Sequence, residues 1–350
     1  MNFSRFLFAI LCPIIALSIP ADASAATRKK VAKEAVAHDF KGAIVMDAAS
    51  GAVLFEENPD IKNPPASMTK LMTFAVLCDR LRAGNITLET PVTITAADSK
   101  IGGTQVWLKE GEVFPVEELI YAMMIQSAND AAYALARATA GSSAAFVDLM
   151  NAKARELGMT NTSFNTPHGL PSRSREASEG DLSSPRDFAI LSRYLLLNTD
   201  ILKYTSVRSR PFGSPQRVIP VAMVNHNHLL TKVAGVDGLK TGFTNGAGFC
   251  LTATAERNHR RIIVVMMGCP DKKIRDLNVA ELLERGFANL PVGGPAFVAG
   301  GSPKTINETS PLSRAPLSPA EQEQAASAPG AAGEAPMIKL NIPPARKGSK

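Results

Sequence analysis

The pattern of apolar and polar positions predicts strands at both ends of a central region and helices between them. Two segments rich in β-branched residues surround a turn of small residues, 48–51, and predict an early hairpin: residues 42–47 and 53–57. Three turn-separated segments predict a later antiparallel meander: residues 233–240, 248–256 and 261–267. A sheet that takes strands from both ends of the region is therefore expected, in a fold of the α+β class.

Helical segments fill the region between these strands. The segment that begins at Ser67 stays apolar through Leu77, which indicates a helix buried on most of its sides. Further helices are predicted at residues 116–126, 130–139, 146–157 and 185–197, and a closing helix at residues 273–290. Gly158 follows one of these segments and Pro185 begins another, as expected for a helix end and a first turn. We expect the middle helices to form a second, all-helical lobe.

Composition separates both ends of the chain from this region. Residues 1–25 are typical of a secretory signal, since Arg5 precedes an apolar stretch and a small-residue cleavage site; an uncleaved anchor is the alternative. Residues 26–39 are predicted to form a basic linker. Residues 291–350 hold 10 of the 24 prolines and are predicted to be a disordered tail. We therefore expect one folded domain at residues 40–290, exported to the periplasm or cell envelope without a strong membrane anchor.

Charge and cysteine content exclude several classes of function. The formal net charge is +6, but the basic residues are scattered, so nucleic acid is not expected as a partner. Cys78, Cys250 and Cys269 follow the signal and lie in apolar sequence, which favours buried thiols. A bridge between Cys250 and Cys269 is the alternative. The cysteine and histidine spacings fit no zinc site, so neither a metal nor another cofactor is predicted.

The first candidate for chemistry is the Ser67-x-x-Lys70 motif at the start of the buried helix. Residues three apart share a helix face, so these two side chains can meet. A serine hydroxyl is a weak nucleophile until a base takes its proton, and a lysine in a dry pocket can lose its own proton near neutral pH. The alternative is an N-cap serine beside a surface lysine. The apolar helix and the sharp entry at Pro64-Pro65 argue against that alternative.

A second motif, Ser127-Ala128-Asn129, lies at the junction of two predicted helices. There a hydroxyl can relay a proton to a leaving amine, and an amide can hold a substrate carbonyl. The segment Ser163-Phe164-Asn165 has the same form, so the pattern alone discriminates poorly, and an ordinary turn is the alternative.

A third motif, Lys240-Thr241-Gly242, ends a predicted strand. Lys240 and Thr241 can bind a carboxylate through charge and hydroxyl, and Gly242 lets a substrate backbone approach closely. The alternative is an exposed lysine at a strand end.

In this order and at these intervals, the three motifs resemble the penicillin-recognising serine enzymes, and among them the low-molecular-mass D-alanyl-D-alanine carboxypeptidases. Flanking segments are similar as well: residues 65–73, 126–131, 157–159 and 236–242. The resemblance covers residues 40–290. It implies a β-lactamase/transpeptidase-like fold, with an antiparallel sheet flanked by helices and an all-helical lobe.

The resemblance also implies an acyl-enzyme mechanism on the D-Ala–D-Ala end of peptidoglycan stem peptides, with β-lactams as covalent inhibitors. Ser67 is the implied nucleophile, Lys70 the general base and Ser127 the proton relay, assisted by Lys240. The implied substrate contacts are Asn129 for the amide, Lys240, Thr241 and Gly242 around the carboxylate, and the backbone N–H groups of Ser67 and Phe243 as oxyanion hole.

Three other functions are alternatives to the carboxypeptidase. A β-lactamase of the most similar class needs a glutamate downstream of the second motif, but residues 157–175 contain no acidic residue. A DD-endopeptidase acting on peptidoglycan crosslinks uses the same motifs and stays open. A non-catalytic wall-binding protein does not explain why Ser67, Lys70, Ser127 and Lys240 are all present.

Overall fold

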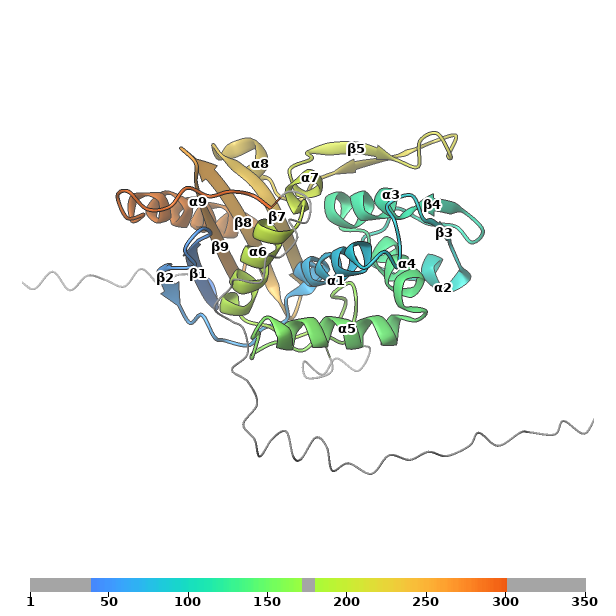
Figure 1. The fold of residues 1–350 in the computed structure, drawn as a ribbon, viewed down its shortest axis with the longest axis horizontal. Helices are drawn as coiled ribbons and strands as arrows, with labels where there is room; N and C mark the ends of the chain where they lie inside the picture. Colours follow the sequence, from blue (N-terminus) through green and yellow to red (C-terminus); the bar gives the residue numbers. More distant parts are fainter. Residues whose placement is uncertain (1–38, 172–179, 301–350) are drawn as a thin grey trace, which may run out of the picture. The chain divides into compact units, whose positions relative to one another are not determined.

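The computed structural model describes residues 39–171 and 180–300. A five-stranded sheet in the order β2-β1-β9-β8-β7, with all neighbours antiparallel, forms its centre (Figure 1). The strands are β1 (Gly42–Asp47), β2 (Val53–Glu57), β7 (Val236–Thr244), β8 (Gly248–Arg257) and β9 (Arg260–Cys269). Because β1 pairs with β9, the sheet unites the two ends of the region, as the sequence predicts.

The two faces of the sheet are covered by different helices (Figure 1). Side chains alternate along β9, so Ile263 and Val265 enter the core shared with α6 (Pro185–Asn198), while Ile262 enters the core under α9 (Lys272–Ala288). Burial on both faces explains why the middle of β9 is almost continuously apolar. The antiparallel sheet flanked by helices confirms the predicted fold class.

The middle of the chain forms the helical lobe, as predicted. Its helices are α1 (Lys70–Arg82), α2 (Ala96–Ser99), α3 (Val116–Tyr121), α4 (Asn129–Ala140) and α5 (Ser143–Glu156). A π-helical turn, Ala122–Gln126, continues α3 to the second motif. Helix α5 begins before the predicted residue 146 because the Ser142 side chain accepts a hydrogen bond from the Ala145 N–H and caps it.

Several short elements were not predicted. They are helix α2 of the helical lobe, the pair β3 (Pro91–Thr93) and β4 (Val113–Pro115), the hairpin β5 (Ser209–Phe212) and β6 (Val221–Val224), and the helices α7 (Ile201–Thr205) and α8 (Leu229–Lys232). Elements of three to five residues are too short to show a period, and three of the strands contain proline. The hairpin packs on the helical lobe through an ion pair between Arg210 and Glu118.

Residues 291–300 belong to the folded part, although the sequence predicts disorder from Pro291 onward. Phe297 is buried, and its N–H donates to the His259 carbonyl, while the Gly300 N–H donates to Leu196. One aromatic residue in a proline-rich stretch is thus enough to hold this segment on the domain. The predicted signal, most of the linker and residues 301–350 lie outside the described residues.

The three described cysteines are free. Cys250 and Cys269 are buried on opposite faces of the sheet, in different apolar cores, which excludes the alternative of a bridge between them. Burial raises the pKa of the Cys250 thiol to about 11, so it stays protonated.

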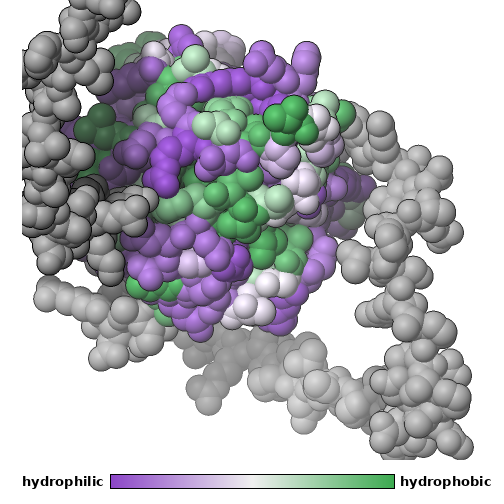
Figure 2. Space-filling model, turned by 90° about the vertical axis from the view of Figure 1, so that its left-hand side faces the viewer, coloured by the Kyte–Doolittle hydropathy of each residue, from purple (hydrophilic) through white to green (hydrophobic). Residues whose placement is uncertain are grey.

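Among the described residues, no helix is long and apolar enough to cross a membrane. On the face that carries β2 and α9, apolar side chains form a band bordered by polar ones (Figure 2). Val53 and Leu277 are the exposed large apolar residues of these two elements.

Candidate active site

Ser67 and Lys70 meet at the point where a 3₁₀ turn, Ala66–Thr69, passes into α1. The Lys70 Nζ lies 3.0 Å from Ser67 Oγ, 2.7 Å from Asn129 Oδ1 and 2.6 Å from the His168 carbonyl oxygen. Lys70 is fully buried, so the alternative of a surface lysine is wrong.

The surroundings of Lys70 favour its neutral form. Burial, and then the positive charge of Lys240, lower the pKa of Lys70 well below its usual value. A neutral amine has two N–H donors and one lone pair. The two N–H groups of neutral Lys70 can donate to Asn129 Oδ1 and to the His168 carbonyl oxygen. The nitrogen lone pair is then free to accept the proton of the Ser67 hydroxyl. The geometry therefore suits a base that removes a proton from Ser67.

Close packing of the chain on itself fixes this turn. A Cβ placed on Gly242 would lie 2.4 Å from the Pro65 carbonyl oxygen, so only glycine lets β7 approach the turn that carries Ser67. The sequence interpretation assigned this close approach to a substrate backbone. In the structure it is the protein's own Pro65-Ala66 segment that needs the space, although Gly242 also lines the cavity.

Ser127 and Asn129 lie on opposite sides of the junction between the π-helical turn and α4. Ser127 has the left-handed φ of 65°, which is uncommon for a residue with a Cβ, and its side chain faces the cavity. The Asn129 amide is engaged by the protein, since its Oδ1 accepts from Lys70 and its Nδ2 donates to the Gly102 carbonyl. Asn129 thus positions Lys70. The similar Ser163-x-Asn165 segment lies elsewhere, with Asn165 bonded to Gly180.

The third motif lies inside β7 and not at its end. The strand continues to Thr244 because Phe243 pairs with Phe249 of β8, and the two rings stack with centroids 4.1 Å apart. Lys240 is buried beneath the strand, and its Nζ donates to the Thr241 carbonyl at 3.1 Å. Burial, and then the charge of Arg275, lower the pKa of Lys240 to about 7.

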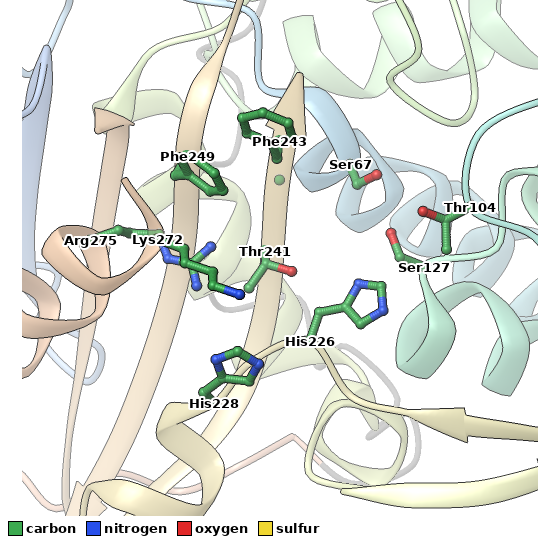
Figure 3. A pocket seen from close by; sticks show the side chains of 11 residues that line it. Ser67, Thr104, Ser127, His226, His228, Thr241, Phe243, Phe249, Lys272 and Arg275 are labelled. Carbon is green, nitrogen blue, oxygen red and sulfur yellow. The ribbon is translucent and has the colours of Figure 1, made fainter. Parts of the chain in front are cut away.

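A cavity of about 360 Å³ joins the three motifs (Figure 3). Five of the predicted residues line it: Ser67, Ser127, Thr241, Gly242 and Phe243. Lys70, Asn129 and Lys240 lie buried behind this lining. The predicted nucleophile and proton relay face each other from the helical lobe, and Thr241 faces them from the sheet. The described residues contain no cluster of His, Cys, Asp or Glu that could hold a metal ion.

Sequence reasoning missed the other residues that line this cavity: Thr104, His226, His228, Phe249, Lys272 and Arg275. The two histidines come from a segment with no periodic pattern, but they alternate with Asn225 and Asn227. Asn225 Nδ2 donates to the Thr205 and Val207 carbonyls and Asn227 Nδ2 donates to that of Gly238, so buried amides hold this segment. That alternation was the available signal. Burial, and then Lys240, lower the pKa of His226 to about 4, which keeps its imidazole neutral at pH 7.

Comparison with known proteins agrees with this geometry. Residues 28–271 match a family model described as D-alanyl-D-alanine carboxypeptidase. The chain is 36% identical to D-alanyl-D-alanine carboxypeptidase DacF of Bacillus subtilis over 284 residues, which covers 81% of this chain and 71% of DacF. It is 38% identical to DacC of Escherichia coli over 261 residues, 73% of this chain and 62% of DacC.

Solved structures give the same result for the fold. The carboxypeptidase DacD of Francisella tularensis matches with a TM-score of 0.67 and 28% identity, over 71% of this chain and 70% of that one. A penicillin-binding protein of Listeria monocytogenes, solved in its ampicillin-bound form, matches with a TM-score of 0.62 and 28% identity. That match covers 71% of this chain and 97% of the other.

Proposed function

The chain belongs to the D-alanyl-D-alanine carboxypeptidase family, and on that premise we propose that it removes the terminal D-alanine from peptidoglycan stem peptides through an acyl-enzyme on Ser67. The observation that carries the proposal is the contact between Lys70 and Ser67: the Lys70 Nζ lies 3.0 Å from Ser67 Oγ, and Ser67 lines the cavity. Lys70 is buried and its pKa is lowered, so its neutral form is favoured.

Acylation begins when neutral Lys70 takes the Ser67 proton and Oγ attacks the carbonyl carbon of the penultimate D-alanine. The developing oxyanion is then stabilised by the backbone N–H groups of Ser67 and Phe243, which the resemblance assigns to this role. Ser127, across the cavity from Ser67, gives its proton to the leaving amine as the carbon–nitrogen bond breaks and takes in return the proton that Lys70 received from Ser67, so that Lys70 is neutral again. Free D-alanine departs, and the acyl group remains on Ser67.

Recognition of the substrate depends on its terminal carboxylate. The Thr241 hydroxyl faces the cavity and can donate to a carboxylate oxygen, with the Lys240 charge behind it. Neutral Lys70 then takes a proton from a water that attacks the ester carbonyl, and the same proton passes from Lys70 to the departing Ser67 oxygen. A β-lactam carbonyl would acylate Ser67 by the same first step, which agrees with the ampicillin-bound relative.

A β-lactamase that activates water with a carboxylate is not favoured. Asp181, the first acidic residue after the acid-free segment among the residues that the structure describes, is buried and accepts hydrogen bonds from Thr69 and from the N–H groups of Asn165 and Thr166. Its oxygens are thereby occupied, and it does not line the cavity.

The test combines product analysis with a mass spectrum. Wild-type protein is expected to release free D-alanine from a stem pentapeptide and to gain one ampicillin adduct, mapped to Ser67. Ser67→Ala should lose both, and Ser163→Ala, a change in the second Ser-x-Asn segment, should lose neither. Cleavage of crosslinked dimers without release of D-alanine would indicate an endopeptidase, and rapid turnover of ampicillin would indicate a β-lactamase.

Export to the periplasm is part of the same proposal, together with a role in cell-wall biogenesis and cell shape. It is supported by the signal-like composition of residues 1–25 and by the substrate, which lies outside the cytoplasmic membrane. N-terminal sequencing of protein from fractionated cells should show a chain that begins after residue 25. Recovery of the uncleaved chain with membranes after a high-salt wash would contradict it.

A further inference from the structure

Besides Lys240 of the third motif, two further cationic residues, Lys272 and Arg275, lie at the cavity. The three side chains differ in whether they are already bonded to other protein groups. Lys240 is buried and its Nζ is bonded to the Thr241 carbonyl. Burial, and then the charge of Arg275, lower its pKa to about 7, so its positive charge is reduced at neutral pH. Because Lys240 is buried and bonded to the protein itself, it is a weak anchor on its own for an anionic group that enters the cavity.

The second cation, Arg275, is already paired. Its Nη2 lies 2.6 Å from Asp276 Oδ1, and its Nη1 donates to the Cys250 carbonyl. His228 also points its Nδ1 at Asp276, at 3.5 Å. The carboxylate of Asp276 thus offsets the charge at this end of the cavity.

Lys272 is different, because it lines the same cavity and its side chain has no hydrogen-bond or ion-pair partner among residues 39–171 and 180–300. Its side chain extends along the cavity wall toward Thr241 (Figure 3). Lys272 is exposed, whereas Lys240 is buried. Of the two cations that line the cavity, Lys272 and Arg275, Lys272 is the one whose side chain has no partner among the described residues.

The position of Lys272 has no structural benefit of its own. It is the first residue of α9, where the helix dipole favours anions and disfavours cations. The capping Asp271 bonds to the N–H groups of Lys273 and Ile274 and forms no ion pair with Lys272. A lysine here breaks the local preference without a compensating contact, as is expected of a residue kept for binding.

We propose that Lys272 is a substrate-binding residue that captures the carboxylate of the leaving amino acid beside Thr241. The proposal rests on the proposed function, because the carboxylate in question is that of the terminal D-alanine. Lys272 then supplies an accessible ammonium that meets the incoming carboxylate, while Thr241 and the buried Lys240 fix the orientation of the carboxylate.

The chain offers a matched control, since the neighbouring Lys273 is also exposed in the first turn of α9 but does not line the cavity. For D-alanine release, Lys272→Gln should raise KM about tenfold with kcat changed less than about twofold, the size expected for one charge-assisted hydrogen bond. Lys273→Gln should leave both constants unchanged, and Lys272→Arg should restore most of the affinity.

A second arm tests whether the charge itself matters. The rate constant of acylation by benzylpenicillin should fall about tenfold in Lys272→Gln, while acylation by its methyl ester, which lacks the carboxylate, should be unchanged. An equal loss with the ester, or the same result for Lys272→Gln and Lys273→Gln, overturns the proposal. This arm measures Lys272 even if the wild-type protein releases no D-alanine, which would count against the proposed function alone.

Discussion

Arg261 on β9 and Asp237 at the start of β7 are joined by two parallel hydrogen bonds, Nη1 to Oδ1 at 2.7 Å and Nη2 to Oδ2 at 2.8 Å. The pair reaches across the intervening strand β8. Arg261 is 2% exposed and is also bonded to Glu256. Asp237 lies three residues before Lys240, so this pair fixes the strand that carries the third motif.

Asp237→Asn should therefore affect both stability and activity. The substitution leaves a buried guanidinium with one carboxylate partner in place of two, which we expect to cost about 2 kcal/mol of the free energy of unfolding. Urea unfolding measures that loss, and kcat/KM for D-alanine release should fall because Thr241 moves with the strand.

The control is Asp60→Asn, which removes an exposed partner of Arg186. An exposed pair of this kind contributes only about 0.2–1 kcal/mol. Equal destabilisation by the two variants would show that burial of Arg261 is not the cause.

The buried Lys70 should make the protein more stable as the pH rises from 7 to 8. Its folded pKa is lowered, so the unfolded state binds more protons below the unfolded pKa, and the free energy of unfolding increases with pH in that range. The increase is at most about 1.4 kcal/mol per pH unit for each proton that differs. Urea unfolding of Lys70→Met should show a smaller slope and a higher stability at pH 7. An unchanged slope would mean that Lys70 is charged in the folded protein.

The pH dependence of acylation should be set in part by the charge of Lys240, because burial, and then that charge, lower the pKa of the general base Lys70. Lys70 must be neutral to accept the Ser67 proton, so acylation falls as the pH is lowered through its pKa. Lys240 is the second cause of the low pKa of Lys70, after burial. Lys240→Gln removes that charge, raises the pKa of Lys70 and moves the acidic limb of the profile to higher pH. The rate of acylation by a neutral ester of penicillin, measured from pH 5 to 9, checks this without the contribution of the carboxylate.

Local patterns were enough for much of the fold and for the reactive pair. The strands at 42–47 and 53–57 have the predicted bounds, and the uniform hydrophobicity of the helix after Ser67 indicated the burial of Lys70. Both depend on neighbours in sequence, where period and spacing carry the information.

Long-range contacts account for what the sequence did not reveal. The engagement of Asn129 depends on Lys70 and Gly102, and the extension of β7 depends on Phe249 of the next strand. His226 enters the cavity from a segment held by carbonyl groups distant in sequence. No local pattern reports such distant partners. The sequence therefore predicts a substrate contact for Asn129 and a strand end at the third motif, and it predicts no role for His226.

Gly242→Ala should reduce acylation severely without preventing folding. The new Cβ would lie 2.4 Å from the Pro65 carbonyl oxygen and 3.3 Å from Ala66 Cβ, so the turn that carries Ser67 must move. Effective catalysis needs reacting groups held within about 0.5 Å, and a displacement of about 1 Å costs about 100-fold in rate. Gly246→Ala is the matched control, because a Cβ there meets nothing within 4 Å and its φ is not left-handed. The acylation rate by ampicillin should fall in the first variant alone; comparable rates in both would show that β7 tolerates a side chain against Pro65, and that glycine at this position serves the substrate instead.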